Sequence, residues 1–287
     1  MKIAIYGSRH QAPYRESIHR LLRSLSLSGV EIYMDRKLYT HLSDDLGMSL
    51  SGIAVAPSVY SNMTGIDLTL SIGGDGTFLR TAAWVGDVGT PILGINTGHL
   101  GYLAPLAIED AAGYIDSILS ADYTIEERHL LEVTSPGFRG QQYALNEVVM
   151  SKEDSASLVA AQTFIGDKEL ATYKADGLIV ATPTGSTAYN LSAGGPIVQP
   201  TAPVIILTPI AAHSLGMRPL VISNDSVLCI TVQGRGRSFR LSVDGRSTTL
   251  PMGTQVAINR APFCVRIAQP KGSGFPSVLR SKLMFNV

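Results

Sequence analysis

The stretch Ile66–Thr77 reads IDLTLSIGGDGT and decides the fold. Its first seven residues predict a buried strand, and the glycine-rich segment Gly73–Thr77 then leads into a helical pattern from Phe78 to Val85. A strand that ends in glycines before a helix is typical of a parallel α/β sheet, in which ligands bind at the carboxyl ends of the strands. We therefore expect Gly73–Thr77 to lie at such an edge.

The residues around this stretch continue the alternation of strand and helix. Apolar residues at helical spacing (Ile18, Leu21, Leu22, Leu25) predict a helix that Gly29 ends. This pattern predicts a doubly wound parallel sheet. The expected strands are Lys2–Tyr6, Val30–Met34, Ile66–Ile72 and Pro91–Asn96, and a further helix is expected over Ile108–Leu119.

After Ala121 the chain becomes rich in β-branched and aromatic residues, which predicts an all-β second domain. Helical texture returns over Pro276–Phe285, and we expect that segment to pack on the first domain. The predicted architecture is thus an α/β domain of residues 1–104 plus 271–287 and an all-β domain of residues 105–270. The expected strands include Thr124–Thr134, Gln142–Ser151, Leu158–Phe164 and Gly177–Ala181.

Composition and charge exclude several classes of protein. Lys plus Arg and Asp plus Glu each number 23 in 287 residues, so the basic excess of a nucleic-acid-coating protein is missing. The longest apolar run, 202–212, is interrupted by two prolines and is too short to span a membrane. The two cysteines, Cys229 and Cys264, lie in strand-like surroundings, so we expect buried thiols and a reducing cytoplasm.

The glycine segment suits phosphate binding. Glycines let the backbone approach a phosphate closely, and a helix N-terminus offers free N–H donors. Asp75 is unusual there, because an anion beside a phosphate is unfavourable unless it binds a metal or takes a proton. The alternative is a tight turn in which Asp75 caps the helix. The segment matches neither a P-loop nor a G-x-G-x-x-G fingerprint.

Three further segments interrupt their surroundings with polar residues. Asn96–Tyr102 follows the next parallel strand, and its His99 is either an acid–base group or an ordinary loop residue. Asn146 and Glu147 interrupt an apolar strand and suit ribose hydroxyls or an adenine edge, unless they are a strand end that faces water. Tyr173–Pro196 is dense in small hydroxyl residues and glycine, as in a nucleotide-binding loop or a plain surface loop.

Together these segments resemble the NAD kinase family, in order and over most of the chain. The resemblance rests on Gly73–Thr77, Asn96–Tyr102, Asn146–Glu147, Asp176–Gly177 and Thr182–Tyr189. It implies an α/β domain followed by an all-β domain, and transfer of the γ-phosphoryl of ATP, or of polyphosphate, to the 2′-hydroxyl of the adenosine ribose of NAD. It also implies a homodimer or homotetramer. The sequence shows no obvious carboxylate cage for a metal, so we expect Mg²⁺ or another divalent cation to arrive with ATP.

The resemblance also assigns residues to roles. Asp75 is the expected general base. Phosphate is expected to bind at Gly73, Gly74, Gly76 and Thr77, and the dinucleotide at Asn146, Glu147, Lys174, Asp176, Thr187, Ala188, Tyr189 and Ser192. Weaker candidates are Arg80, His99, Tyr102 and Asp244, of which Asp244 also fits a hairpin turn at Val243–Arg246.

Two positions depart from the family pattern. Lys174 stands where many members carry Arg, which grips a phosphate bidentately as Lys does not. Tyr102 stands where Phe is usual. Two other functions stay open at this point: a lipid or sugar kinase that shares only the glycine segment, and a regulator that binds NAD(P) without catalysis.

Overall fold

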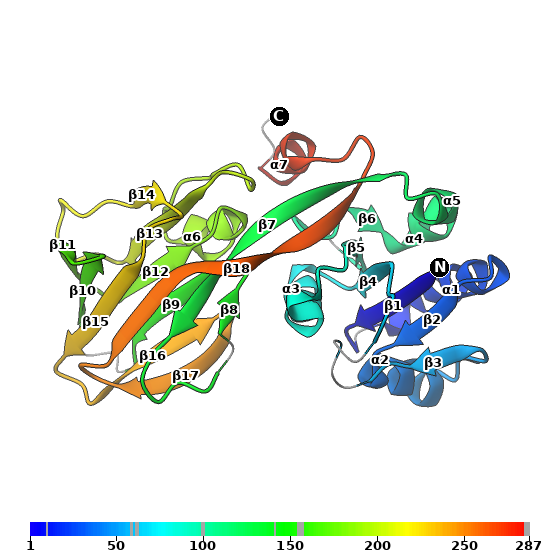
Figure 1. Ribbon diagram of the computed structural model, residues 1–287, viewed down its shortest axis with the longest axis horizontal. Helices are drawn as coiled ribbons and strands as arrows, with labels where there is room; N and C mark the ends of the chain where they lie inside the picture. The colour runs from blue at the N-terminus through cyan, green and yellow to red at the C-terminus, as the bar shows by residue number, and fades with distance from the viewer. Residues whose placement is uncertain are drawn as a thin grey trace. The chain divides into compact units, whose positions relative to one another are not determined.

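The computed structural model describes residues 1–9, 11–57, 60, 63–98, 101–140, 142–153 and 158–283 (Figure 1). It divides into two compact units, Met1–Glu127 with Val265–Val287, and Arg128–Cys264. The chain passes from one unit to the other within strands β7 (Tyr123–Thr134) and β18 (Gln255–Pro270). These bounds differ from the predicted 1–104 plus 271–287 and 105–270, because the segment after residue 104 packs on the first unit.

The first unit is built on a parallel sheet with the strand order β5–β4–β1–β2–β3. The short strand β6 and the end of β18 also pair with β5 in parallel. The strands are β1 (Lys2–Gly7), β2 (Glu31–Met34), β3 (Ile53–Val55), β4 (Leu68–Ile72), β5 (Ile92–Asn96) and β6 (Leu106–Ala107). The predicted strand–helix alternation and parallel sheet are therefore confirmed.

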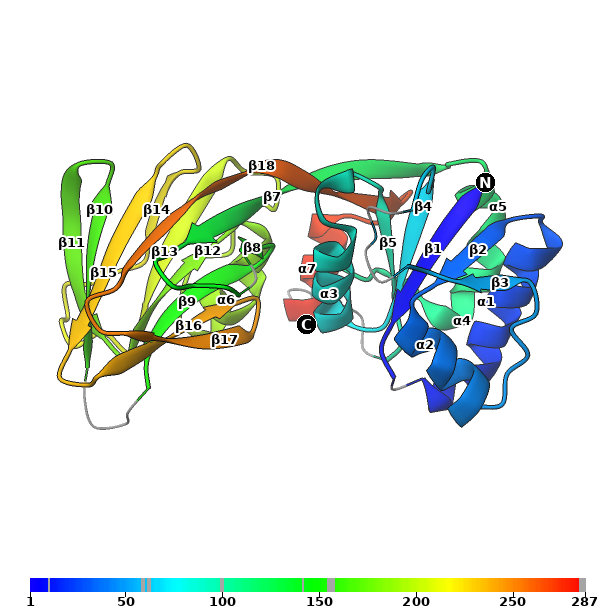
Figure 2. The ribbon, with the colours of Figure 1, turned by 60° about the horizontal axis from the view of Figure 1, so that its bottom comes forward.

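The helices of this unit cover both faces of its sheet. Figure 2 shows α3 and α7 on one face and α1 and α4 on the other. This follows from right-handed crossovers, since the chain moves from β1 to β2 in one direction across the sheet and from β4 to β5 in the other. The helices are α1 (Arg15–Leu27), α2 (Arg36–Thr40), α3 (Asp75–Val85), α4 (Ile108–Ala111), α5 (Ile115–Leu119) and α7 (Phe275–Leu283).

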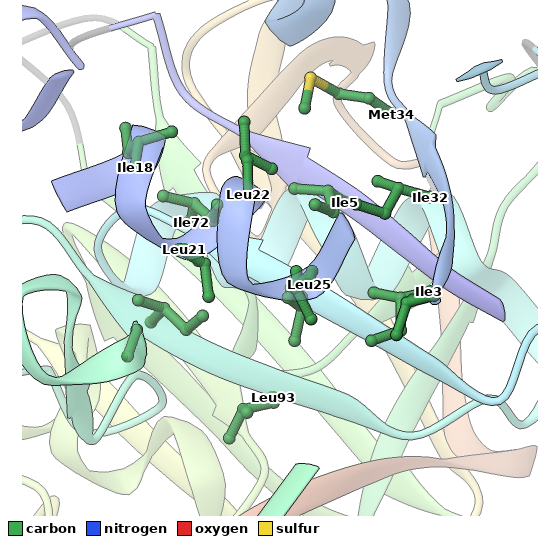
Figure 3. Close-up of a cluster of buried hydrophobic side chains, with 14 of the residues drawn as sticks. Ile3, Ile5, Ile18, Leu21, Leu22, Leu25, Ile32, Met34, Ile72 and Leu93 are labelled. Carbon is green, nitrogen blue, oxygen red and sulfur yellow. The ribbon is translucent and has the colours of Figure 1, made fainter. Parts of the chain in front are cut away.

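The core of the first unit lies between α1 and the sheet. The helix places Leu21, Leu22 and Leu25 against strand residues such as Ile3 and Ile5, as the periodicity predicts (Figure 3). Gly29 follows the helix in a left-handed conformation with φ of 71°. The predicted helix over Ile108–Leu119 is instead broken: α4 and α5 flank a 3-10 turn at Ala112–Tyr114, which contains the helix-weakening Gly113.

The second unit is antiparallel and mostly β, as predicted. One sheet has the order β14–β13–β12–β9–β16–β17, and β11–β10–β15–β18 are hydrogen-bonded in a second group; apolar side chains from both form one core. Its elements are β8 (Tyr143–Ala144), β9 (Glu147–Lys152), β10 (Val159–Ile165), β11 (Lys168–Ala175), β12 (Gly177–Ala181), α6 (Tyr189–Ser192), β13 (Val204–Ile210), β14 (Leu220–Ser223), β15 (Leu228–Gly234), β16 (Ser238–Val243) and β17 (Arg246–Pro251).

One detail of the sequence analysis, the burial of the two cysteines, is corrected. Cys229 and Cys264 are free but only partly buried, so the expectation of two buried thiols is wrong. Cys229 alternates with the core residues Leu228 and Ile230 along β15, so its side chain points away from the core. Within the described residues, no helix is long and apolar enough to span a membrane.

Candidate functional site

In the first unit, the glycine segment joins β4 to α3, and its backbone is restricted by a close contact and by hydrogen bonds. Gly73 has φ of 151°, and a Cβ atom there would lie 2.4 Å from Oγ1 of Thr77. Gly74 is the N-cap, and its carbonyl accepts hydrogen bonds from the N–H groups of Thr77 and Phe78. Gly74 and Gly76 are exposed. The segment therefore presents backbone at the N-terminus of an eleven-residue helix, where an anion is favoured.

Asp75 is the first residue of α3 and does not cap it, so that alternative is wrong. Its carboxylate instead reaches the segment after β5: Oδ2 accepts from the N–H of Tyr102 at 2.8 Å and Oδ1 from the N–H of Leu103 at 2.9 Å. A Cβ atom on Gly101 would lie 2.0 Å from Oδ1 of Asp75, so a larger residue there would have to displace the carboxylate or the loop. The motif after β4 and the loop after β5 thus meet at this carboxylate.

Two positively charged residues contact the glycine segment and the loop. Arg80 donates to Oγ1 of Thr77 at 3.0 Å. Nζ of Lys282, on α7, lies 5.7 Å from the ring centroid of Tyr102, a cation–π distance. Burial, and secondarily the charge of Asp75, raise the pKa of Tyr102. The predicted candidate His99 lies outside the described residues. Sequence analysis places α7 on this unit but does not identify Lys282.

In the second unit, Glu147 is the first residue of β9 and Asn146 directly precedes it, and both are only 9% exposed. The alternative that they are a strand end facing water is therefore wrong. The N–H groups of Leu145, Asn146 and Glu147 all donate to the carboxylate of Asp244, at 2.8, 2.9 and 3.1 Å. Asp244 lies in the predicted hairpin turn between β16 and β17, with φ of 46°.

The Thr182–Ser192 loop packs against the same segment. Oγ1 of Thr182 donates to the carbonyl of Leu145 at 2.6 Å, and a Cβ atom on Gly185 would lie 2.2 Å from the carbonyl oxygen of Asn146. The buried amide of Asn190 donates to the carbonyls of Ser186 and Pro196. The loop is therefore held by hydrogen bonds and close packing, unlike a plain surface loop. Of the predicted binding residues, Tyr189 and Ser192 are exposed, and Thr187 and Ala188 are partly buried.

Glu147 has a distinctive electrostatic environment. Its carboxylate accepts a hydrogen bond from the backbone N–H of Tyr189, which lowers its pKa, but burial and the charge of Asp244 outweigh this and raise that pKa to about 7. Within the part of the chain that the structure describes, its Oε2 atom is buried without a hydrogen-bond partner. A buried, unsatisfied acceptor is costly in isolation, so this oxygen is suited to a hydroxyl or amino donor of a ligand.

Two of the predicted binding residues lie elsewhere on this unit. Glu147 pairs with Ala181 in the β9–β12 ladder, whereas Asp176 precedes the other end of β12 and forms an ion pair with Lys152 at 2.7 Å. Lys174 is exposed on β11. The second unit thus brings Asn146 and Glu147 together with Asp244 and the Thr182–Ser192 loop, but it separates Asp176 and Lys174 from them.

Comparison with known proteins gives the same result for both units. Residues 9–123 match the family model described as ATP-NAD kinase N-terminal domain, and residues 145–269 match the ATP-NAD kinase C-terminal domain. The chain is 43% identical over 284 residues to an NAD kinase of Porphyromonas gingivalis, covering 99% of this chain and 98% of the relative. It is 40% identical over 288 residues to an NAD kinase of Bacteroides fragilis, with the same coverage.

Two solved structures are also similar. Yeast NADH kinase complexed with NADH superposes with a TM-score of 0.88 at 26% identity, covering all of this chain and 88% of that one. An NAD kinase from Archaeoglobus fulgidus in complex with ATP has a TM-score of 0.76 at 23% identity, covering 99% and 98%, and so supports the fold alone.

Proposed function

The chain belongs to the NAD kinase family, and we propose here how its own residues carry out the reaction of that family. That reaction transfers a phosphoryl group from ATP to NAD and yields NADP. In bond terms, the 2′-oxygen of the adenosine ribose bonds to the γ-phosphorus of ATP, the bond from that phosphorus to ADP breaks, and the hydroxyl proton leaves. The match of both family models disfavours a lipid or sugar kinase that shares only the glycine segment.

The observation that carries the assignment of roles is the carboxylate of Asp75 beside the exposed glycine backbone. Phosphoryl transfer depends on positioning and charge stabilisation more than on covalent chemistry. Phosphate is predicted from the sequence at Gly73, Gly74, Gly76 and Thr77, but the N–H groups of Gly73 and Thr77 already donate to the carbonyls of Ile95 and Gly74. We therefore assign the donor phosphates to the exposed backbone of Gly74 and Gly76, with Arg80 as a nearby positive charge. Asp75 orients the acceptor hydroxyl and takes its proton late in the transfer, for which two N–H bonds hold it in place.

The acceptor dinucleotide is assigned to the second unit. The unpartnered Oε2 of Glu147 accepts a hydrogen bond from a ribose hydroxyl. The side-chain amide of the preceding residue, Asn146, supplies both a hydrogen-bond donor and an acceptor. Tyr189 and Ser192 are exposed on the adjoining loop and can contact the ligand, whereas Thr187 and Ala188 contribute backbone.

Mg²⁺ belongs to the ATP substrate in this proposal. Among the residues that the structure describes, no group of three His, Cys, Asp or Glu side chains is placed to hold a metal ion. Mg²⁺ commonly keeps several waters and binds through substrate phosphates. Its chemistry is to neutralise charge on the transferred phosphoryl group.

We further propose a homodimer or homotetramer in the cytoplasm. Asp176 and Lys174 are separated from Glu147 within one chain, so we assign the contacts predicted for them to a dinucleotide that a second copy holds. Two free cysteines suit a reducing compartment. Light scattering after gel filtration measures the oligomeric state, and a monomer at micromolar concentration contradicts this part of the proposal.

The reaction is tested by mixing the purified chain with NAD and Mg·ATP and reading NADP with an NADP-specific dehydrogenase. NADP is expected only when both substrates are present. Replacing ATP by polyphosphate, and NAD by NADH, defines the donor and the acceptor. A folded protein that binds NAD but forms no NADP with any donor would instead indicate a non-catalytic regulator.

A further inference from the structure

The segment Leu145–Glu147 is held by two residues that are distant from it in sequence. Its three N–H groups donate to the carboxylate of Asp244, and the backbone N–H of Asp244 donates back to the carbonyl of Glu147 at 3.1 Å. The carbonyls of Leu145 and Asn146 accept from Oγ1 and N–H of Thr182, at 2.6 and 2.8 Å. Asp244 and Thr182 thus satisfy all the backbone polar groups of the segment.

One feature of Asp244 is explained by the hairpin turn and the other is not. Its left-handed conformation is the one that a two-residue type I′ turn requires, but its carboxylate is buried although the residue is partly exposed. Burial raises the pKa of Asp244, which the three N–H bonds and the charge of Arg246 oppose. Asn or Gly serves a two-residue hairpin turn equally well, so the carboxylate is needed for the contact with Leu145–Glu147 rather than for the turn.

We propose that Asp244 is a positioning residue for the dinucleotide site. Its carboxylate fixes the backbone of Leu145–Glu147, and this sets the direction in which the side chains of Asn146 and Glu147 point. Its negative charge also adds to the effect of burial in opposing ionisation of Glu147, and so shifts the pH at which that carboxylate is ready to accept a hydrogen bond from a ribose hydroxyl. The inference rests on the proposed assignment of NAD to Asn146 and Glu147.

The pH dependence involves a small set of groups. Among the residues that the structure describes, Asp244 is the ionisable group that acts on Glu147, and Arg246 is the charge that acts on Asp244. The Glu147 side chain also accepts a hydrogen bond from the N–H of Tyr189. The ionised form of Glu147 is the better acceptor, so NAD affinity is expected to rise with pH through neutrality. Removal of the Asp244 charge is expected to move that rise to lower pH.

The test is NAD binding by calorimetry across pH 5.5–8.5, with Asp244→Asn as the variant. Asn tolerates the left-handed conformation and supports the turn, but it lacks the charge and places an NH₂ group against the N–H donors. At pH 7.5 the Kd for NAD is expected to rise at least about tenfold, because a buried array of hydrogen bonds is broken. The pH midpoint of binding is expected to fall, and the KM for ATP to stay within about twofold.

Glu153→Gln is the matched control. Glu153 also contacts this hairpin, where it accepts hydrogen bonds from Ser238 on β16 and Thr249 on β17, but it is exposed and these hydrogen bonds are to the hairpin rather than to Leu145–Glu147. This variant is expected to bind NAD as the unaltered chain does. A lower thermal stability of Asp244→Asn with an unchanged pH midpoint would reduce Asp244 to a structural role and overturn the inference.

The same experiment separates this inference from the proposed function. If the unaltered chain binds no NAD, the assignment of NAD to this site fails. If it binds NAD and Asp244→Asn binds equally well with the same pH midpoint, the assignment stands and the positioning role of Asp244 fails.

Discussion

Each unit contains an aspartate whose carboxylate accepts hydrogen bonds from consecutive backbone N–H groups. Asp75 holds the N–H groups of Tyr102 and Leu103, and Asp244 holds those of Leu145, Asn146 and Glu147. Their surroundings differ. Asp75 lies at a helix N-terminus, which favours a negative charge, whereas burial raises the pKa of Asp244, whose charge in turn acts on Glu147.

The difference separates two uses of one local arrangement. A carboxylate stabilised by a helix N-terminus, beside exposed glycine backbone, remains available to a substrate. A carboxylate that is buried among three N–H donors has its acceptor oxygens occupied by the neighbouring segment and is not available to a substrate. The comparison therefore predicts that Asp75 affects turnover, whereas Asp244 affects binding.

Asp75→Asn makes the largest change expected from this comparison. Turnover should fall about 10²–10⁴-fold, because the amide cannot accept the hydroxyl proton. The Kd for NAD should stay nearly constant, because the second unit is unaltered. Steady-state kinetics and NAD calorimetry on the same preparation check both. Unchanged turnover would exclude Asp75 as the base. A loss of NAD affinity as large as that expected for Asp244→Asn would show that the two aspartates do not differ in this way.

Much of the first unit could be predicted from sequence because its signals are local. The strand before Gly73, the helix after it and the spacing of Leu21, Leu22 and Leu25 all lie within one or two turns of the residues they determine. The break at Gly113 in the expected Ile108–Leu119 helix could not be predicted as firmly, because a glycine inside a helix is tolerated when packing supports it.

The second unit shows where such reasoning fails. The Asp-Gly pair at residues 244 and 245 predicts a hairpin, and the hairpin is present. The contact of Asp244 with Leu145–Glu147 spans almost a hundred residues of sequence, and no local pattern contains it. The predicted group of binding residues is likewise divided by the β9–β12 register, which leaves Asp176 at the far end from Glu147.

Gly101→Ala tests whether the position of Asp75 matters as well as its charge. The added Cβ atom would lie 2.0 Å from Oδ1, so the carboxylate or the loop must move. A displacement of this size at a catalytic group is expected to lower kcat about 10²-fold. Gly113→Ala is the matched control, since its Cβ atom would meet open space and kcat should not change. Normal turnover in Gly101→Ala would mean that the position of Asp75 is not critical.

Glu147→Gln tests the electrostatic side of the comparison through stability. The pKa of Glu147 is raised from 4.5 to about 7 in the folded chain, so its contribution to stability is fully present below pH 4.5 and is lost as the pH rises through about 7. The unaltered chain should therefore lose up to about 3 kcal/mol relative to the variant between pH 4.5 and 8. Urea unfolding of both chains at pH 5 and pH 8 measures this difference.

Glu153→Gln gives the opposite sign and so serves as a control for that measurement. Hydrogen bonds from Ser238 and Thr249 lower the pKa of Glu153, so its contribution is present at neutral pH and is lost as the pH falls. Parallel pH dependences of stability for the unaltered chain and Glu147→Gln would show that Glu147 is not a buried acid in the folded state.

Lys282→Met is expected to have the smallest effect. It tests whether residues beyond the Tyr102 and Leu103 backbone help to position Asp75. Among the described residues, Lys282 lies over the ring of Tyr102, whose N–H donates to Asp75, and a cation–π contact that is not deeply buried contributes about 0.5–1 kcal/mol. Turnover should therefore fall only about two- to fivefold.

Lys282→Arg preserves the contact and should restore turnover, whereas Lys271→Met, which removes the ion pair with Asp122 on the same unit, should leave it unchanged. If Lys282→Met and Lys271→Met are equally active, Asp75 is positioned by the backbone N–H groups of Tyr102 and Leu103 without help from Lys282. Its positioning would then be as local as that of Asp244, and the two sites would differ only in their electrostatic surroundings.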